Sequence, residues 1–259
     1  MNRNILITIE YDGTDYSGWQ RQPDQRTVQG ILEEALSKVC DMPISIDGVS
    51  RTDAGVHALG QRATFAGDFG IPTDRIMLAV NNLLAGGAIA STKDGDVRII
   101  DVKEVPAGFH ARFDAVGKKY RYKIRNTQDM PVFLRNYRYH VRTPLDVEKM
   151  NEAAALLKGT HDFACFQAAG GNPRLTTVRT ITDISVFQAT DGDVVLEVSG
   201  DGFLYNMVRI ITGTLVEVGQ GKIAPEKMNE ILDSGDRQLA GHTAPPQGLY
   251  LVEVYYKLN

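Results

Sequence analysis

The sequence has few cysteines and no long apolar run. Its 259 residues include two cysteines, Cys40 and Cys165, which lie far apart and form no C-x-x-C pair. This usage argues against a disulfide framework or a zinc site and favours a reducing cytoplasm. No stretch approaches the roughly 20 apolar residues that cross a bilayer, so we expect no membrane partner. The first residues show no signal-peptide pattern.

Phosphate-binding loops and metal-ligand patterns are also missing. Neither G-x-x-x-x-G-K-[ST] nor G-x-G-x-x-G occurs beside a helix start. The five histidines form no ligand pattern, and His110 and His161 have no second ligand at helical spacing. His57 fits a structural turn better than a general base, because no orienting partner can be named for it. The sequence therefore predicts no metal site.

The charge balance is slightly acidic, with a formal net charge of -4. This balance argues mildly against a nucleic-acid partner, but phosphate binding needs only a local basic surface. Whether the protein can bind a nucleic acid therefore depends on how its cations are distributed along the chain.

Apolar residues alternate between periods of two and of about 3.6, which indicates a mixed α/β or α+β protein. In the first half we expect helices at 28–39, with Thr27 as N-cap, and at 74–84, and strands at 4–11, 44–49, 61–66 and 97–102. In the second half we expect helices at 147–157, ended by Gly159, at 205–218 and after Pro225, and strands at 118–126, 178–187, 193–199 and 249–256. Each half reads β-α-β-β-α-β, the split βαβ arrangement, which predicts domains at 1–105 and 106–259.

The densest polar segment is 48–58, which leaves a strand and enters a glycine-containing loop. Within three residues it offers a cation, a hydroxyl and a carboxylate, from Arg51, Thr52 and Asp53. Loops at strand ends often carry reactive side chains. Aspartate is also a favoured turn residue, so a satisfied turn with a solvated Arg51 is the competing interpretation.

Residues 117–125 alternate like a strand with two different faces. Lys119, Arg121, Lys123 and Arg125 form a cationic ladder suited to phosphates, whereas Tyr120 and Tyr122 face the other side, where a base can stack. A core strand with a solvated charged face explains the pattern equally well. Further cations flank this segment: Arg135, Arg138, Arg142, Arg174 and Arg179.

Arg209 stands in an apolar helical segment, at i+3 from Asn206. An arginine there is unusual unless it is paired or reaches the surface. Paired with Asp53, it would keep that carboxylate ionised in a partly buried pocket. An arginine that extends into solvent is the alternative.

Taken together, these segments resemble the tRNA pseudouridine synthase A family over nearly the whole chain. The most specific is Arg51-Thr52-Asp53-Ala54-Gly55-Val56-His57-Ala58. The others, in order, are Tyr11-Asp12-Gly13, Gly18-Trp19-Gln20, Thr27-Val28-Gln29-Gly30, Phe109-His110-Ala111-Arg112-Phe113, Lys119-Tyr120-Arg121-Tyr122, His161-Asp162-Phe163, Val178-Arg179-Thr180-Ile181 and Phe203-Leu204-Tyr205-Asn206-Met207-Val208-Arg209. One departure is the long, Gly/Ala-rich segment 85–95, which leaves its contacts with RNA open.

The resemblance implies an α+β fold of two ferredoxin-like halves that share an extended, mostly antiparallel sheet with helices on one face. It implies Asp53 as the catalytic aspartate, Arg209 as its partner and Arg51 as a holder of the flipped nucleotide. Tyr120 would stack on the target base, and Lys119 and Arg121 would bind the substrate. The implied enzyme is a cytoplasmic homodimer that lacks a cofactor and isomerises uridine in the tRNA anticodon stem-loop (positions 38–40).

These residue types suit that reaction. The target base must leave its stack at a cost of roughly a few kcal/mol, and an aromatic ring can recover about 1–3 kcal/mol by stacking. An ionised carboxylate supplies a nucleophile or base without a cofactor. Three routes stay open: attack on C1′, addition to the ring, and removal of a sugar proton.

Two other classes of protein fit part of the pattern. A glycoside hydrolase normally needs a second carboxylate, and no motif nominates a partner for Asp53. A non-catalytic RNA-binding module explains Tyr120 and Tyr122 but leaves Asp53 and Arg209 unexplained.

Overall fold

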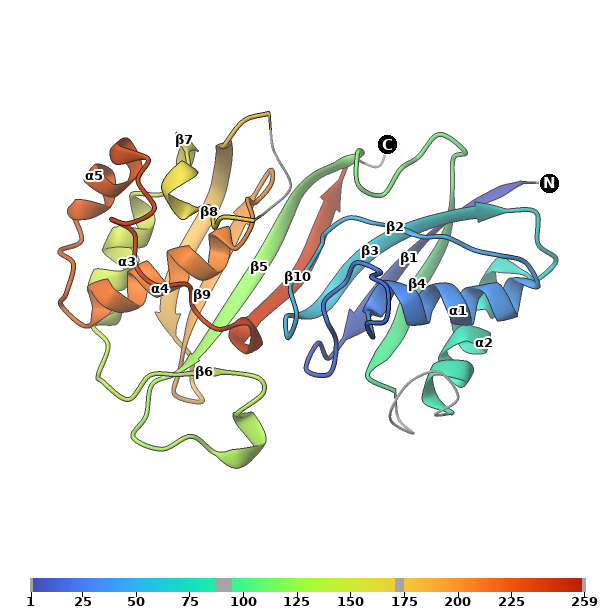
Figure 1. The fold of residues 1–259 in the computed structure, drawn as a ribbon, viewed down its shortest axis with the longest axis horizontal. Helices are drawn as coiled ribbons and strands as arrows, with labels where there is room; N and C mark the ends of the chain where they lie inside the picture. The colour runs from blue at the N-terminus through green and yellow to red at the C-terminus, as the bar shows by residue number, and fades with distance from the viewer. Residues whose placement is uncertain (1, 87–94, 171–174, 258–259) are drawn as a thin grey trace. The chain divides into compact units, whose positions relative to one another are not determined.

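A computed structural model describes residues 2–86, 95–170 and 175–257. Within these ranges the chain forms ten strands and five α-helices (Figure 1). Six of the seven strand pairings described below are antiparallel and one is parallel, so the predicted α+β class with a mixed, mostly antiparallel sheet is confirmed.

The chain divides into two compact units. Unit 1 comprises Met1–Val116 with Leu251–Asn259, and unit 2 comprises Gly117–Tyr250. Two strands, β5 (Ala115–Arg125) and β10 (Leu249–Tyr256), contribute residues to both units, so the chain passes between the units inside strands rather than through linkers. The proposed domain division at residues 105 and 106 stays a prediction.

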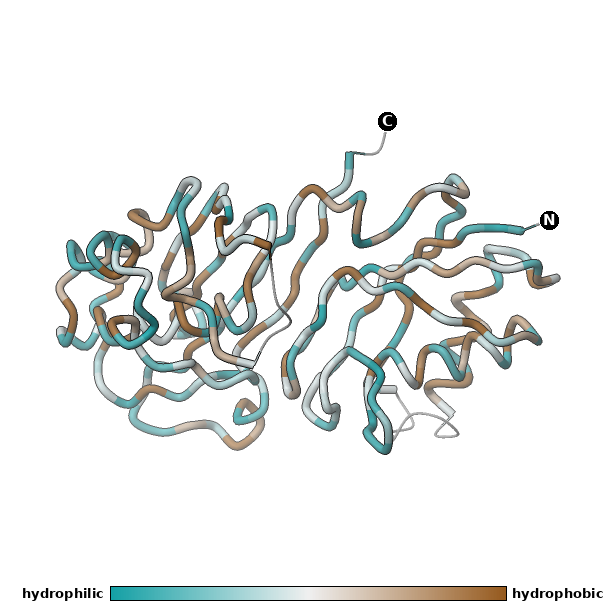
Figure 2. The backbone as a smooth tube through the Cα atoms, turned by 45° about the horizontal axis from the view of Figure 1, so that its top comes forward, coloured by the Kyte–Doolittle hydropathy of each residue, from teal (hydrophilic) through white to brown (hydrophobic). Residues whose placement is uncertain are grey.

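Unit 1 is organised around β1 (Arg3–Tyr11), which pairs with β3 (His57–Gly67) and β4 (Val97–Val105). A short strand, β2 (Asp47–Gly48), pairs with β3 as well. With a neighbour on each side, β1 supplies apolar side chains to the core, and Ile5, Ile7 and Ile9 are fully buried. Figure 2 shows that β1 begins hydrophilic and becomes hydrophobic along its length.

Two helices complete unit 1. The helix α1 (Val28–Cys40) begins as predicted, because the Thr27 hydroxyl accepts a hydrogen bond from the Gly30 N–H. The helix α2 (Thr73–Ala85) is tied to β4 through Asn81, whose amide group bonds both the N–H and the C=O of Ile99 at 2.8 Å.

Unit 2 places four strands in the order β5, β9 (Asp193–Gly200), β8 (Val178–Gln188) and β7 (Gly159–Asp162). The short strand β6 (Tyr139–His140) runs parallel to β5. The helices are α3 (Val147–Ala155), α4 (Met207–Gly219) and α5 (Lys227–Ser234). Here α4 is the most buried helix, with Ile210, Ile211 and Leu215 fully enclosed.

Several element boundaries differ from the prediction. The strand expected at 61–66, for example, begins earlier, at His57. The strand expected at 44–49 is reduced to β2, because the Ile44 and Ile46 N–H groups donate instead to the Ser37 and Glu33 side chains of α1. Gly159 does not end α3 but opens β7, a strand that the sequence pattern missed. The helix expected from 205 begins at Met207, because Asn206 is left-handed, with φ of 60°.

No helix within the described ranges is long and apolar enough to cross a membrane. Three 3₁₀ turns that the sequence pattern did not predict lie at Val132–Leu134, Ala164–Phe166 and Pro246–Gly248.

Both cysteines are buried free thiols, which predicts low reactivity. Burial raises the pKa of the Cys165 thiol to about 12 and also raises the pKa of Cys40. Because the thiolate is the reactive form, a disulfide reagent at pH 8 should label neither thiol promptly in the folded protein and both after denaturation. Prompt labelling of the folded chain would contradict the packing, and Cys40→Ala and Cys165→Ala identify the thiol responsible.

The same shifts predict a loss of stability in alkali. The folded Cys165 thiol keeps a proton that the unfolded thiol releases above its ordinary pKa of about 8.5. Its contribution to the free energy of unfolding is therefore fully present below about pH 8.5 and declines toward pH 12. Cys165→Ala should flatten this decline in urea titrations at pH 8 and pH 10, and an unchanged slope would contradict the assignment.

Candidate functional site

The segment that carries Asp53 is a tight loop between β2 and β3 in unit 1. Its side chains alternate in exposure: Arg51 is exposed, Thr52 is buried and Asp53 is intermediate. Gly55, with φ of 77°, turns the chain, and the Val56 N–H donates to the Asp53 carbonyl at 3.2 Å. The loop therefore offers a carboxylate at the edge of a buried framework rather than a fully solvated one.

Thr52 anchors this loop from both its backbone and its side chain. Its carbonyl accepts a hydrogen bond from the Trp19 N–H at 3.0 Å. Its hydroxyl lies 2.7 Å from the Tyr11 hydroxyl, in a buried contact. Because Tyr11 ends β1, the residue before Asp53 is fixed to the central strand of unit 1.

Two glycines allow the neighbouring chain to approach the loop closely. A Cβ on Gly18, whose φ is +91°, would lie 2.7 Å from the Thr52 carbonyl oxygen. A Cβ on Gly13 would lie 2.0 Å from the Val56 carbonyl oxygen. Both separations are too short for real atoms, so segment 12–19 packs against the Asp53 loop backbone to backbone.

Trp19 fills the space beneath the loop. Its side chain is 1% exposed and lies against Gly48, where an added Cβ would meet the indole at 2.4 Å. The Tyr11 and Trp19 rings are 6.1 Å apart between centroids. Residues from several separate motifs of the sequence thus converge on one loop: Tyr11, Gly13, Gly18, Trp19, Thr52 and Val56.

His57 takes a structural position at the start of β3. It is 2% exposed, and its Nδ1 accepts a hydrogen bond from the Gly13 N–H at 3.1 Å. The same nitrogen lies 3.2 Å from the Asp12 carboxylate. These contacts hold the turn after β1, as expected for a structural histidine.

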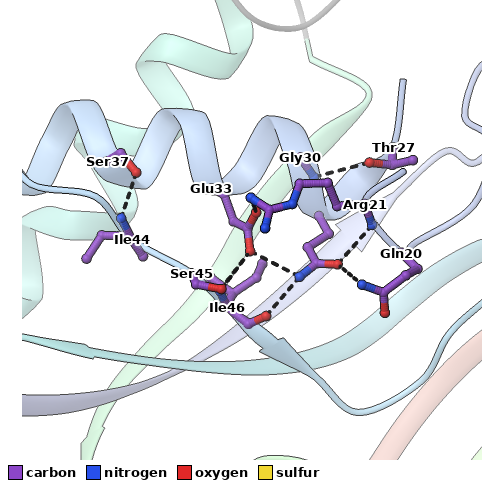
Figure 3. A network of polar contacts seen from close by, with 10 residues as sticks. Gln20, Arg21, Thr27, Gly30, Glu33, Ser37, Ile44, Ser45 and Ile46 are labelled. Atoms are coloured by element: carbon purple, nitrogen blue, oxygen red, sulfur yellow. Dashed lines mark hydrogen bonds and ion pairs between the residues drawn. The ribbon is translucent and has the colours of Figure 1, made fainter. Parts of the chain in front are cut away.

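A buried polar network fixes segment 19–21 to α1 (Figure 3). The Gln29 side-chain oxygen accepts from the Gln20 side-chain amide at 2.8 Å and from the Arg21 backbone N–H at 2.9 Å. The Gln29 amide donates to the Glu33 carboxylate at 3.0 Å and to the Ile46 carbonyl at 3.1 Å. The Gln29 N–H also donates to the Trp19 carbonyl at 3.0 Å. Gln29 thus connects α1 with the loop at residues 19–21 and with the segment that leads into β2.

The charge of this network is balanced locally. The Glu33 side chain is 5% exposed, and its carboxylate also accepts from the Ile46 N–H and the Ser45 hydroxyl. Arg21 supplies the countercharge at 2.9 Å. These hydrogen bonds and the Arg21 charge together compensate the cost of burying the Glu33 carboxylate.

Arg209 lies in unit 2, in the first turn of α4. Its Nε donates to the Ala244 carbonyl and its Nη1 to the Asn206 side-chain oxygen, both at 2.7 Å. The Ala244 N–H returns a bond to the Arg209 carbonyl at 3.0 Å. The predicted proximity of Asn206 and Arg209 is therefore observed, and the guanidinium is held in one plane.

The strand β5 supports the segment that holds Arg209. The buried Tyr122 hydroxyl donates to the Pro245 carbonyl. Burial raises the pKa of Tyr122 well above its ordinary value, although the nearby Arg209 charge acts in the opposite direction. Tyr122 therefore stays a neutral donor and belongs to the core, so it offers no free ring for a base.

Tyr120 lies two residues earlier on β5, on the same face as Tyr122. Its ring meets Phe203 edge to face, with centroids 5.1 Å apart and planes at 84°. Tyr120 is 9% exposed, so little of the residue meets solvent.

The cations on the other face of β5 are paired with carboxylates. Glu197 on β9 lies 2.5 Å from Lys119 and accepts from Arg121 at 2.7 Å, and these cations lower its pKa although burial acts to raise it. Asp193, which is 1% exposed, pairs with Arg125 and Arg138. The ladder predicted from the sequence therefore exists, but its charge is partly neutralised.

Other predicted features occupy separate places. Arg135 and Arg142 are exposed in unit 2, whereas Arg174 lies outside the described residues, as do residues 87–94 of the Gly/Ala-rich segment 85–95. Within the described ranges, no group of three His, Cys, Asp or Glu side chains could hold a metal ion.

Two contributors were missed by sequence reasoning. The role of Glu197 depends on strand pairing, which sets it opposite Arg121. The Gln29–Glu33 pair does carry a local signal, because i and i+4 side chains meet on a helix.

The Figure 3 network generates a stability prediction. Gln29→Leu leaves the Ile46 carbonyl and one Glu33 acceptor without their amide donor, so the free energy of unfolding should fall by about 2–4 kcal/mol. Urea unfolding measures this loss. Lys38→Leu, on the exposed side of α1, serves as the matched control. Equal stability of Gln29→Leu and the control would contradict a structural role for the network.

Comparison with known proteins places these features in a family. A family model described as tRNA pseudouridine synthase matches residues 7–114 and 153–257. The tRNA pseudouridine synthase A of Acetivibrio thermocellus is 49% identical over 254 residues, which cover 98% of this chain and 100% of that protein. The protein of the same name from Ruminiclostridium cellulolyticum gives the same identity and coverage.

A solved Cbf5–Nop10–Gar1 complex shows only a weak likeness. It aligns with 82% of this chain and 54% of its own chain, at 12% identity and a TM-score of 0.33. The sequence relatives and the family model are sufficient by themselves: the chain belongs to the tRNA pseudouridine synthase family.

Proposed function

We propose that this protein isomerises uridine to pseudouridine in the anticodon stem-loop of tRNA, at positions 38–40, with Asp53 as the catalytic carboxylate. The observation that carries the proposal is the fixation of the Asp53 loop through Thr52, Tyr11 and Trp19. A reaction that breaks the N1–C1′ bond and rejoins the base through C5 requires a positioned nucleophile or base. The membership of the family supports tRNA as the substrate.

The exposure of the side chains in the Asp53 loop suits a reaction with tRNA. Asp53 is intermediate in exposure, so a substrate can approach it, whereas Thr52 beside it is buried. Arg51 is exposed on the same loop and is proposed to hold the flipped nucleotide by contacting its phosphate. The pair divides the work, with Arg51 binding and Asp53 reacting.

Unit 2 supplies the other proposed substrate contacts. Tyr120 is assigned to stacking on the target base, and its edge-to-face contact with Phe203 would orient the ring for this role. Lys119 and Arg121 are assigned to the RNA backbone, with Glu197 setting their positions. Because Glu197 neutralises part of their charge, we expect Lys119 and Arg121 to orient the RNA backbone more than they attract it from a distance.

Arg209 is the proposed partner of the Asp53 carboxylate. Its bonds to Ala244 and Asn206 fix the guanidinium before substrate arrives, which lowers the cost of organising the site. An adjacent cation favours the ionised form of a carboxylate that RNA shields from water.

We further propose that the enzyme works as a homodimer in the cytoplasm without a cofactor. The residue roles assigned above require only side chains of the chain itself. Sedimentation of the purified protein, with and without tRNA, measures the oligomeric state directly.

The decisive experiment uses unmodified tRNA with uridines just 3′ of the anticodon. Pseudouridine is mapped by carbodiimide-blocked primer extension after incubation with the wild type or Asp53→Asn, without added metal or nucleotide. We expect modification by the wild type and none by Asp53→Asn. Asp41→Asn is the matched control, because Asp41 is exposed at the C-cap of α1, and it should react like the wild type.

Each other outcome overturns part of the proposal. Release of free uracil would indicate a glycoside hydrolase rather than an isomerase. A folded wild type that binds tRNA but forms no product would indicate a binding module. Normal activity of Asp53→Asn would return Asp53 to a structural turn.

The Arg209 assignment generates a second test. Arg209→Lys keeps the charge but cannot repeat the planar pair of bonds to Ala244 and Asn206. Misplacement of about 1 Å can cost about 100-fold, so the single-turnover rate at saturating tRNA should fall by about that factor. Arg142→Lys, at an exposed position of unit 2, should keep the wild-type rate. Equal rates for Arg209→Lys and the wild type would remove Arg209 from the site.

A further inference from the structure

The turn that joins β4 to β5 (Figure 1) carries a phenylalanine, Phe113, whose side chain is exposed. Phe113 is 76% exposed, whereas Ala111, two residues earlier, is fully buried. This is the motif Phe109-His110-Ala111-Arg112-Phe113, to which the proposed chemistry assigns no role. A single exposed aromatic ring is common on protein surfaces, so the residues around Phe113 must indicate whether the ring binds a ligand.

The turn is firmly anchored in unit 1. The Asn4 amide donates to the Pro106 carbonyl at 3.0 Å and to the Phe109 carbonyl at 2.7 Å. The Ala111 N–H donates to the Thr64 hydroxyl, and the Ala111 carbonyl accepts from the Tyr256 hydroxyl at 2.9 Å. Phe113 therefore projects from a rigid base, which lowers the entropy lost when a ligand contacts it.

Two side chains that can carry positive charge border the Phe113 ring. The His110 ring is 4.3 Å away between centroids, at an interplanar angle of 43°. The Arg112 guanidinium carbon is 5.8 Å from the Phe113 centroid. His110 is itself positioned, because its ring Nδ1 accepts from the Arg112 backbone N–H at 3.1 Å and its backbone N–H donates to the Asp114 carboxylate at 2.7 Å.

This arrangement suits a nucleobase better than a protein surface. A stable protein interface needs about 800 Å² per partner with an apolar centre, whereas Phe113 is a single ring beside a histidine and an arginine. A base needs one exposed ring to stack on and a cation near its phosphate. The nearby carboxylates are accounted for: Asp114 caps the turn, and Asp47 lies 3.8 Å from the His110 Nε2.

We propose that Phe113, bordered by His110 and Arg112, is a stacking contact for an unpaired nucleotide of the tRNA substrate. The contact would be additional to the site around Asp53, with Arg112 facing the adjoining phosphate. The inference rests on the proposed function for the identity of the RNA. It assigns to the turn a role in substrate affinity and none in the chemical step.

Three variants test the contact in the full-length protein with unmodified tRNA. Phe113→Ala should weaken tRNA binding by about 5- to 150-fold, the range that one stacked base provides, without changing the single-turnover rate at saturation. Phe113→Trp should bind like the wild type, and its fluorescence should be quenched by tRNA, since the natural Trp19 is buried. Phe187→Ala, at a 42% exposed phenylalanine of β8, is the matched control and should bind normally.

A fourth variant measures the charge contribution. Arg112→Gln should reduce the slope of log affinity against log salt by about one phosphate contact. Thermal unfolding of all variants shows whether the turn remains folded.

The outcomes separate this contact from the proposed reaction. Wild-type affinity in Phe113→Ala, or an equal loss in Phe187→Ala, would overturn the stacking contact even if the wild type forms pseudouridine. A change in oligomeric state of Phe113→Ala without a change in tRNA binding would overturn it in favour of a protein interface. Failure of the wild type to form pseudouridine would instead refute the proposed function.

Discussion

The hydrogen bond from the Trp19 N–H to the Thr52 carbonyl is the contact on which the proposed site depends most. It joins the segment after β1 to the residue that precedes Asp53. The neighbouring residue is Gly18, and a side chain at that position would collide with the Thr52 carbonyl. Backbone contacts of this kind do not depend on rotamers, so they fix position more firmly than a surface side chain can. The buried Tyr11–Thr52 pair adds a second fixed point from the central strand. Catalytic groups on loops need such support, because loops are otherwise the most mobile parts of a fold.

Behind this contact, buried polar side chains hold neighbouring segments together. Gln29 and Glu33 connect α1 with segment 19–21 and with the approach to β2, and every bond replaces one that water would otherwise make. In unit 2, Glu197 similarly fixes Lys119 and Arg121. In both arrangements a carboxylate fixes the position of a cationic side chain and, at the same time, neutralises part of its charge. The protein has a net charge of -4 and acts on a polyanion. Its affinity for RNA must therefore depend on the positions of a few cations rather than on its total charge.

Much of the fold could be predicted from the sequence, because the signals are local. Thr27 caps α1 as expected, and the period-two pattern of β5 gives its two faces correctly. The short β2 could not be predicted, because the Ile44 and Ile46 N–H groups bond side chains of the preceding helix α1, and a period-two pattern does not reveal such contacts. The Asp53 loop was recognisable by its residues, yet its support by Gly13 and Gly18 depends on tertiary contact. Tyr122 was a plausible stacking ring from its spacing, and only its burial and its bond to Pro245 assign it to the core.

The measurement that tests this account most directly is the single-turnover rate of pseudouridine formation by Gly18→Ala, compared with Gly221→Ala. Both glycines have positive φ, +91° and +74°, so both substitutions strain the backbone similarly. An added Cβ at Gly18 would press on the Thr52 carbonyl, whereas nothing lies within 4 Å of one at Gly221. If Thr52 positions Asp53, Gly18→Ala should stay folded and bind tRNA but react at least about 100-fold more slowly than Gly221→Ala. Equal rates for the two variants would contradict the account.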